Sequence, residues 1–191
     1  TLVIYLLESG KIPKPKSFTI YYADTRLELS PLSIAAYNII DQLKERGYNV
    51  EVVMAEMDKR FMVYILGRGV PPPNNMTLRW CTGQIKVQPM RNALEKLYDK
   101  HGKVLMITGV RQGESAIRDN RIVMSCSKDG AECGQGWFQT DKSIVAISDT
   151  LAPLLHWRVC HVWEWLRHWA PLPEYGDWDT EIIADAYGGD E

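Results

Sequence analysis

The chain has 191 residues, of which 46% are hydrophobic and 24% charged, and its formal net charge is −2. This composition is typical of one globular domain, which at this length buries about 70% of its unfolded surface. The near-neutral charge gives no overall basic footprint for nucleic acid. Since neither a membrane-spanning apolar run nor a secretory leader is seen, we expect a cytoplasmic protein without membrane contact.

The first half of the chain alternates helix and strand patterns. Residues 1–7 are almost wholly apolar and predict a buried helix that ends near Ser9-Gly10. Residues 18–22 are rich in aromatic and β-branched side chains, which predicts a strand. Ser30-Pro31 predicts the next helix start, with serine as the cap and proline in the first turn.

The helix that starts at Ser30 presents one apolar stripe, made of Leu32, Ala36, Ile39, Ile40 and Leu43. Gly47 ends this helix, and residues 49–54 alternate between apolar and polar as a second strand does. Because a helix crosses over between the two strands, we expect them to be parallel, with a right-handed connection.

The second half is less regular. Residues 56–67 predict a helix, residues 67–76 a proline-rich loop, and residues 89–101 a helix with one apolar face. Residues 103–107 form an apolar run typical of a strand buried on both faces of a parallel sheet. Three further stretches follow: a loop or short hairpin at 125–139, an aromatic-rich and mainly helical part at 150–170, and an acidic tail at 174–191.

The strand at 103–107 ends at Thr108-Gly109, and four polar residues follow it: Arg111, Glu114, Ser115 and Arg118. Ligands of open α/β sheets bind beyond the carboxyl ends of the strands, and arginine forks suit phosphate or sulfate. We therefore expect Arg111 and Arg118 to clamp an anion. The alternative is that Glu114 simply pairs with Arg118 on a solvated helix face.

Asp24 and Thr25 follow the strand at 18–22 in the same way. A carboxylate at this place could hold Mg²⁺ beside phosphates or orient a nucleotide. The alternative is a turn residue that satisfies its own backbone, as aspartate does after many strands. The residues leave both interpretations open.

Residues 79–86 gather a cation, an aromatic ring, a thiol and a second cation: Arg79, Trp80, Cys81 and Lys86. The two cations would favour the thiolate of Cys81, which is the form that attacks sulfur or binds iron. Cys126 and Cys133 could join Cys81 in an iron–sulfur site, which remains one ligand short of the usual four, since Cys160 is a poor fourth. The alternatives are reduced structural thiols, with Cys81 packed behind Trp80.

Residues 156–168 carry three histidines, a cysteine and a glutamate at helical spacing: His156, Cys160, His161, Glu164 and His168. Such spacing invites a metal interpretation. We favour a core-facing helix in which the tryptophans and other apolar residues pack, while the polar residues face solvent or neighbours.

Three segments together carry a resemblance. Gly109-Val-Arg-Gln-Gly-Glu-Ser-Ala-Ile-Arg118 resembles the G-x-R-x-x-E-S-x-x-R segment of the phosphoadenosine phosphosulfate (PAPS) reductase family. Residues 71–89 resemble the R-W-C-T-x-x-x-K-x-x-P block of the sulfurtransferase subunit of DNA phosphorothioation systems. Residues 151–166 are similar to the family's P-L-x-x-W-x-x-x-D-V-W-x-Y-L segment, with His161 in place of the aspartate.

The resemblance implies a three-layer α/β/α fold with a mainly parallel sheet, of the HUP or adenine-nucleotide α-hydrolase type. The family's first strand and its glycine-rich S-G-G-K-D-S phosphate loop, the PP-loop, would stand immediately before Thr1 and are not in the sequence. Arg26 stands where the family usually has glycine after Asp-Thr. We expect a nucleotide-binding core at 1–120 and, within the same domain, a cysteine-containing loop and helical part at 121–191.

The resemblance further implies an enzyme that binds ATP or an adenylyl sulfate (PAPS or APS) with Mg²⁺ and uses it for sulfur transfer or adenylation. The implied nucleotide and anion residues are Asp24, Thr25, Arg79, Lys86, Gly109, Arg111, Glu114, Ser115 and Arg118; Cys81 and Arg111 would be catalytic, and Cys81, Cys126 and Cys133 would hold a [4Fe–4S] cluster. The implied partners are a sulfur donor such as a cysteine desulfurase, and DNA as one acceptor; the oligomeric state is left open. Two alternatives stand beside this function: a PAPS or APS reductase, although no cysteine follows Cys160 to serve as the tail cysteine of such enzymes, and a non-catalytic nucleotide-binding or assembly subunit.

Overall fold

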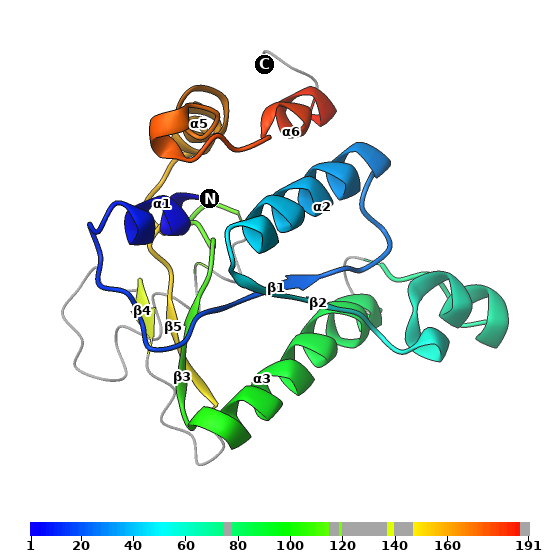
Figure 1. The fold of residues 1–191 in the computed structure, drawn as a ribbon. Helices are drawn as coiled ribbons and strands as arrows, with labels where there is room; N and C mark the ends of the chain where they lie inside the picture. Colours follow the sequence, from blue (N-terminus) through cyan, green and yellow to red (C-terminus); the bar gives the residue numbers. More distant parts are fainter. Residues whose placement is uncertain (75–77, 115–118, 120–136, 140–146, 188–191) are drawn as a thin grey trace. The chain divides into compact units, whose positions relative to one another are not determined.

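A computed structural model describes residues 1–74, 78–114, 119, 137–139 and 147–187 (Figure 1). The chain is a mixed α/β protein whose strands pair mainly in parallel. It divides into two compact units, one formed by Thr1–Arg91 with Trp163–Glu191 and the other by Asn92–Val162. The division at residue 120 stays a prediction.

The first unit is built on a parallel β-α-β arrangement, as the sequence predicts. Strand β1 (Thr19–Ala23) pairs along its whole length with β2 (Asn49–Val53), and α2 (Ser30–Glu45) connects them (Figure 1). Helix α1 (Leu2–Glu8) precedes β1 and confirms the apolar helix at the start of the sequence. The polar segments that follow β1 and β2 therefore meet at one edge of this strand pair.

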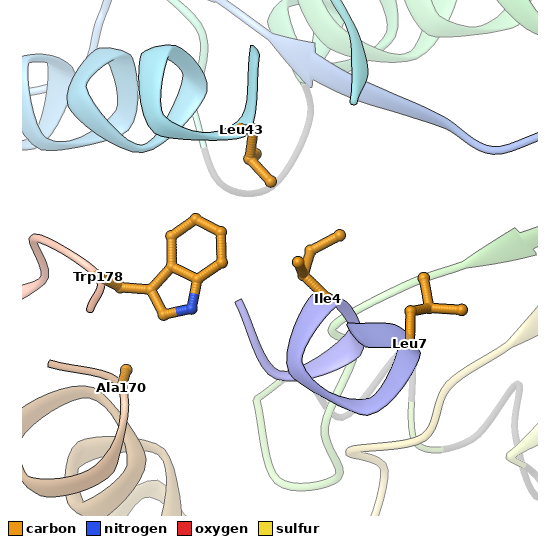
Figure 2. Packing of buried hydrophobic residues seen from close by; sticks show 5 residues of the cluster. All are labelled: Ile4, Leu7, Leu43, Ala170 and Trp178. Atoms are coloured by element: carbon orange, nitrogen blue, oxygen red, sulfur yellow. The ribbon is translucent and has the colours of Figure 1, made fainter. Parts of the chain in front are cut away.

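The core of the first unit joins both ends of the chain. Its buried residues are Ile4, Leu7, Leu43, Ala170 and Trp178, which Figure 2 shows from close by. Trp178 is 1% exposed, and it lies between a short 3₁₀ turn (Pro173–Tyr175) and helix α6 (Glu181–Ala186). A segment that the sequence marks only as acidic thus supplies the largest buried side chain of this core.

Two local predictions in the first unit are wrong. Ser30 is not a cap: the cap position of α2 is Leu29, no side chain caps the helix, and Pro31 lies in its first turn. Residues 56–67 do not form one helix, because the extended backbone at Arg60 separates a 3₁₀ turn (Met57–Lys59) from a π-helical turn (Val63–Gly67).

A long helical stretch leads from the first unit into the second. It passes through a π-helical part (Thr82–Val87) into α3 (Gln88–His101), which confirms the helix predicted at 89–101. No described helix is long and apolar enough to cross a membrane.

The second unit contains a three-stranded sheet in the order β3-β5-β4 (Figure 1). Strand β3 (Val104–Ile107) runs parallel to β5 (Ser148–Leu151), and β4 (Phe138–Gln139) is antiparallel to β5. An ion pair of 2.7 Å between Lys103 Nζ and Asp149 Oδ1 joins the beginnings of the two parallel strands. The strand predicted at 103–107 is confirmed.

The burial of β3 differs from expectation. Leu105 and Ile107 are 54% and 38% exposed, whereas Val104 and Met106 are half-buried, so neither face of β3 is fully buried. The helical prediction for 150–170 is also wrong at its beginning, where Thr150 and Leu151 belong to β5. Helix α5 (Val159–Glu164) and a π-helical turn (Trp165–Trp169) follow. Most of the loop predicted at 125–139 lies outside the described residues.

Candidate functional site

A hollow lies beyond the carboxyl ends of β3 and β5 in the second unit. Its volume is about 520 Å³, and it is lined by Arg111, Gln112, Gly113, Leu155, His156, Trp157, Arg158 and Val159. Both lining segments directly follow one of the two parallel strands, and a hydrogen bond of 2.9 Å from the Gln112 amide to the Leu155 carbonyl joins them. The volume falls in the range of about 300–1,000 Å³ that small-molecule sites occupy.

Arg111 is held in place on one wall of this hollow. Its Nε pairs with Glu114 Oε1 at 3.1 Å, and its Nη1 donates to the Trp157 carbonyl at 3.4 Å. The side chains of Arg111 and Glu114 are 18% and 28% exposed, so the pair is partly shielded from water. Nη2 has no partner in the part of the chain that the structure describes and can donate to a ligand.

Of the three polar residues expected beside Arg111, the structure describes Glu114. Glu114 pairs with Arg111, while Ser115 and Arg118 lie outside the described residues. Gly109 lies between β3 and Arg111, where an added Cβ would meet nothing within 4 Å. Thr108 beside it carries a buried Oγ1 that has no hydrogen-bond partner among the described residues.

The opposite wall contains residues that sequence reasoning did not assign to an anion site. His156 Nδ1 lies 3.2 Å from Gln112 Oε1, and because an amide oxygen accepts, the ring nitrogen donates. Trp157 and Arg158 complete this wall. One sequence pattern could have identified this wall. The apolar run Ile144-Val-Ala-Ile147 is typical of a strand, and a strand there would place residues 152–159 at a sheet edge.

A second group of predicted residues lies beyond β1, in the first unit. Asp24 is 5% exposed, and its carboxylate accepts two hydrogen bonds, from the Arg26 amide at 2.9 Å and from the Tyr37 hydroxyl at 2.8 Å. It also forms an ion pair with Arg26 Nε at 3.1 Å. The hydrogen bond to Asp24, together with partial burial and the charge of that carboxylate, raises the pKa of Tyr37 above its ordinary value of 10.0. The neutral phenol is thereby kept as a donor.

Thr25 shapes the same turn. Its hydroxyl lies 2.8 Å from both carboxylate oxygens of Glu28 and donates to that group, while it accepts the Leu27 amide at 3.3 Å. These contacts close a tight turn immediately after β1.

The third predicted group lies on the helical stretch before α3. Arg79 and Lys86 are exposed, and no described acidic residue pairs with either of them. Cys81 is a half-buried free thiol whose sulfur lies 4.0 Å from Thr82 Oγ1. Trp80 stacks on Phe61 with ring centroids 5.5 Å apart, so the ring packs within the protein.

The described residues contain no group of three or more histidine, cysteine, aspartate or glutamate side chains that could hold a metal ion. Cys126 and Cys133 lie outside these residues, so of the expected cluster ligands the structure describes Cys81 alone. Cys160 is an exposed free thiol, and His161 Nδ1 accepts the Arg158 amide at 3.2 Å.

Parallel strand pairs joined by helices define an α/β protein, and polar groups beyond the carboxyl ends of such strands occupy the place where ligands of this fold class bind. The family model of the phosphoadenosine phosphosulfate reductase domain matches residues 2–170, and the chain belongs to this family. Comparison with curated proteins and with solved structures gave no match.

Proposed function

We propose that the chain is the nucleotide-binding part of a sulfurtransferase- or adenylation-type enzyme that takes ATP or an adenylyl sulfate. The observation that carries this proposal is Arg111, which lines a hollow of nucleotide size beyond two parallel strands in a chain of the PAPS reductase family. A guanidinium with one nitrogen left for a ligand suits a phosphate or sulfate group.

The proposed chemistry uses charge neutralisation more than covalent steps on the protein. An acceptor oxygen attacks the α-phosphorus of ATP and pyrophosphate leaves; a sulfur nucleophile then displaces AMP from the adenylate. Arg111 would hold the departing charge, and Arg158 on the same hollow adds a second cation. Mg²⁺ would enter with the nucleotide phosphates.

Cys81 is proposed to carry the sulfur atom that is transferred. Arg79 and Lys86 are near it in sequence, and nearby cations favour the thiolate form that such a carrier needs. A cysteine desulfurase would then be the donor, and DNA the acceptor if the chain belongs to the phosphorothioation branch. A [4Fe–4S] cluster would require Cys126 and Cys133 together with Cys81 and a further ligand.

The test uses the full-length gene product. Isothermal titration calorimetry with ATP, APS and PAPS is expected to show binding of an adenine nucleotide, and ATP–pyrophosphate exchange is expected to show turnover. Release of sulfite from PAPS without exchange would indicate a reductase instead. Nucleotide binding with neither activity would indicate the non-catalytic subunit, and absence of nucleotide binding would refute the proposal. Iron and sulfide analysis after anaerobic purification decides the cluster.

A further inference from the structure

The hollow beyond β3 and β5 contains an ionisable side chain that the proposed function does not use. His156 lies on its wall, in the loop that follows β5. The side chain is exposed, so it can meet a ligand that enters the hollow. An imidazole changes its charge between about pH 5 and 8, and it can therefore respond to an anionic ligand near neutral pH.

Gln112 determines which nitrogen of this ring gains or loses a proton. Its Oε1 lies 3.2 Å from His156 Nδ1 and accepts a hydrogen bond from it. Gln112 is itself anchored, because its amide donates at 2.9 Å to the carbonyl of Leu155, the residue immediately before His156. Nδ1 therefore keeps its proton in both charge states of the ring, and Nε2 is the nitrogen that titrates.

The charged groups around the hollow balance one another when His156 is neutral. Arg111 pairs with Glu114 at 3.1 Å. Arg158 also lines the hollow, and its guanidinium has no partner among the described residues. Asp119 adds a second carboxylate, which accepts a backbone amide of the lining segment at 3.1 Å. Among these groups two arginines stand against two carboxylates, so a proton on His156 makes the surroundings of the hollow positive.

His161 lies beside the same wall but has a different role. Its Nδ1 accepts the Arg158 amide at 3.2 Å, and its ring packs edge-on against Trp157 with centroids 6.2 Å apart. These contacts hold the loop at the beginning of α5. His161 can titrate in the same pH range, so an experiment on His156 needs a variant of His161 as its control.

We propose that His156 contacts the ligand of the hollow: in its protonated form, Nε2 donates to the phosphate or sulfate group of the nucleotide, and Gln112 positions the ring for this contact. The inference rests on the proposed function, because the ligand is the same nucleotide. It adds that binding takes up a proton at His156. Since a ligand that prefers the protonated ring also favours its protonation, affinity rises as the pH falls.

The experiment measures how tightly the full-length gene product binds ATP, APS and PAPS between about pH 5.5 and about pH 8.5, by isothermal titration calorimetry. Wild type is compared with His156→Gln, whose side chain is polar but does not ionise. The ratio of the two affinities at each pH removes the ligand's own ionisation, because both proteins meet the same ligand. His156 is exposed, so the variant is expected to fold, which circular dichroism and urea unfolding verify at both ends of the range.

At about pH 8.5, where an imidazole is neutral, the two proteins are expected to bind equally. At about pH 5.5 the wild type is expected to bind about tenfold or more tightly than His156→Gln, because it alone makes a charge-assisted hydrogen bond. His161→Gln is the matched control and should keep the pH dependence of the wild type.

A further variant tests the role of Gln112. Gln112→Glu places a carboxylate against Nδ1, which favours the protonated ring. The pH at which the affinity ratio changes is therefore expected to move upward, when Gln112→Glu is compared with Gln112→Glu/His156→Gln. An unchanged pH would overturn the positioning role of Gln112.

An affinity ratio near one at every pH would overturn the inference. A pH dependence that is lost in His161→Gln and kept in His156→Gln would do the same. In both cases the proposed function stands, because the nucleotide still binds. If the wild type binds no adenine nucleotide at any pH, the proposed function itself fails and the inference falls with it.

Discussion

Replacing Arg111 by alanine is expected to weaken nucleotide binding about 10- to 150-fold. Nε of Arg111 pairs with Glu114 at 3.1 Å, and Nη1 donates to the Trp157 carbonyl at 3.4 Å. Nη2 is therefore the nitrogen that can donate to the ligand. A hydrogen bond to a charged group contributes about 1.5–3 kcal/mol. At about 1.4 kcal/mol per factor of ten, this gives the stated range.

The same substitution should leave the fold intact. The Arg111–Glu114 pair is partly exposed, at 18% and 28%, and such pairs contribute about 0.2–1 kcal/mol after solvent screening. The matched variant Glu114→Gln is expected to act in the opposite direction, because it releases Arg111 from its carboxylate and concentrates its charge on the ligand. We expect equal or tighter binding for this variant.

The assay is isothermal titration calorimetry with PAPS and ATP, with urea unfolding to control for stability. Wild-type affinity in Arg111→Ala would refute the assignment of an anion site. Equal weakening by Arg111→Ala and Glu114→Gln would also refute it, since that pattern belongs to an ion pair that only supports the loop.

Three further predictions concern the first unit. Trp178→Ala should lower the free energy of unfolding by about 3–5 kcal/mol, because the indole is 1% exposed in the core, and a urea midpoint equal to that of the wild type would contradict this. Gly176→Ala should also destabilise the protein, by more than about 1 kcal/mol: φ is +119° and an added Cβ would lie 2.5 Å from Trp178 Nε1, so a neutral thermal-shift result would contradict that packing. The Tyr37–Asp24 hydrogen bond raises the pKa of Tyr37, so its contribution to stability is present below pH 10.0, the ordinary tyrosine value, and is lost as the pH rises through the higher folded value. Phenolate absorbance, as the difference between wild type and Tyr37→Phe, should give a midpoint above 10.0; a midpoint at or below it would exclude the hydrogen bond.

Two errors of sequence interpretation in the second unit share one cause. Strand β5 was missed because Ser148–Leu151 is short and partly polar, and its central position depends on pairing with β3 and β4. The wall of the hollow that follows β5 was therefore interpreted as the start of a helix. Once β5 is recognised, His156 and Arg158 lie at the same sheet edge as Arg111.

The sequence by itself determined the local elements and the likeness to the family. The spacing of apolar residues predicts α2, α3 and the parallel pair β1 and β2. Within each segment this spacing indicates the type of element and the face that it buries. The polar residues after β1 and β3 follow from the rule that strand ends carry ligands.

Only the tertiary structure decided which polar groups meet. In the folded chain Trp178 packs in one core with Ile4. Glu114 forms an ion pair with Arg111, and Asp24 forms one with Arg26. Such partners depend on turn conformation and on contacts between segments distant in sequence. Hydrophobic periodicity carries no information about either, since it records only the alternation of buried and exposed positions within one segment.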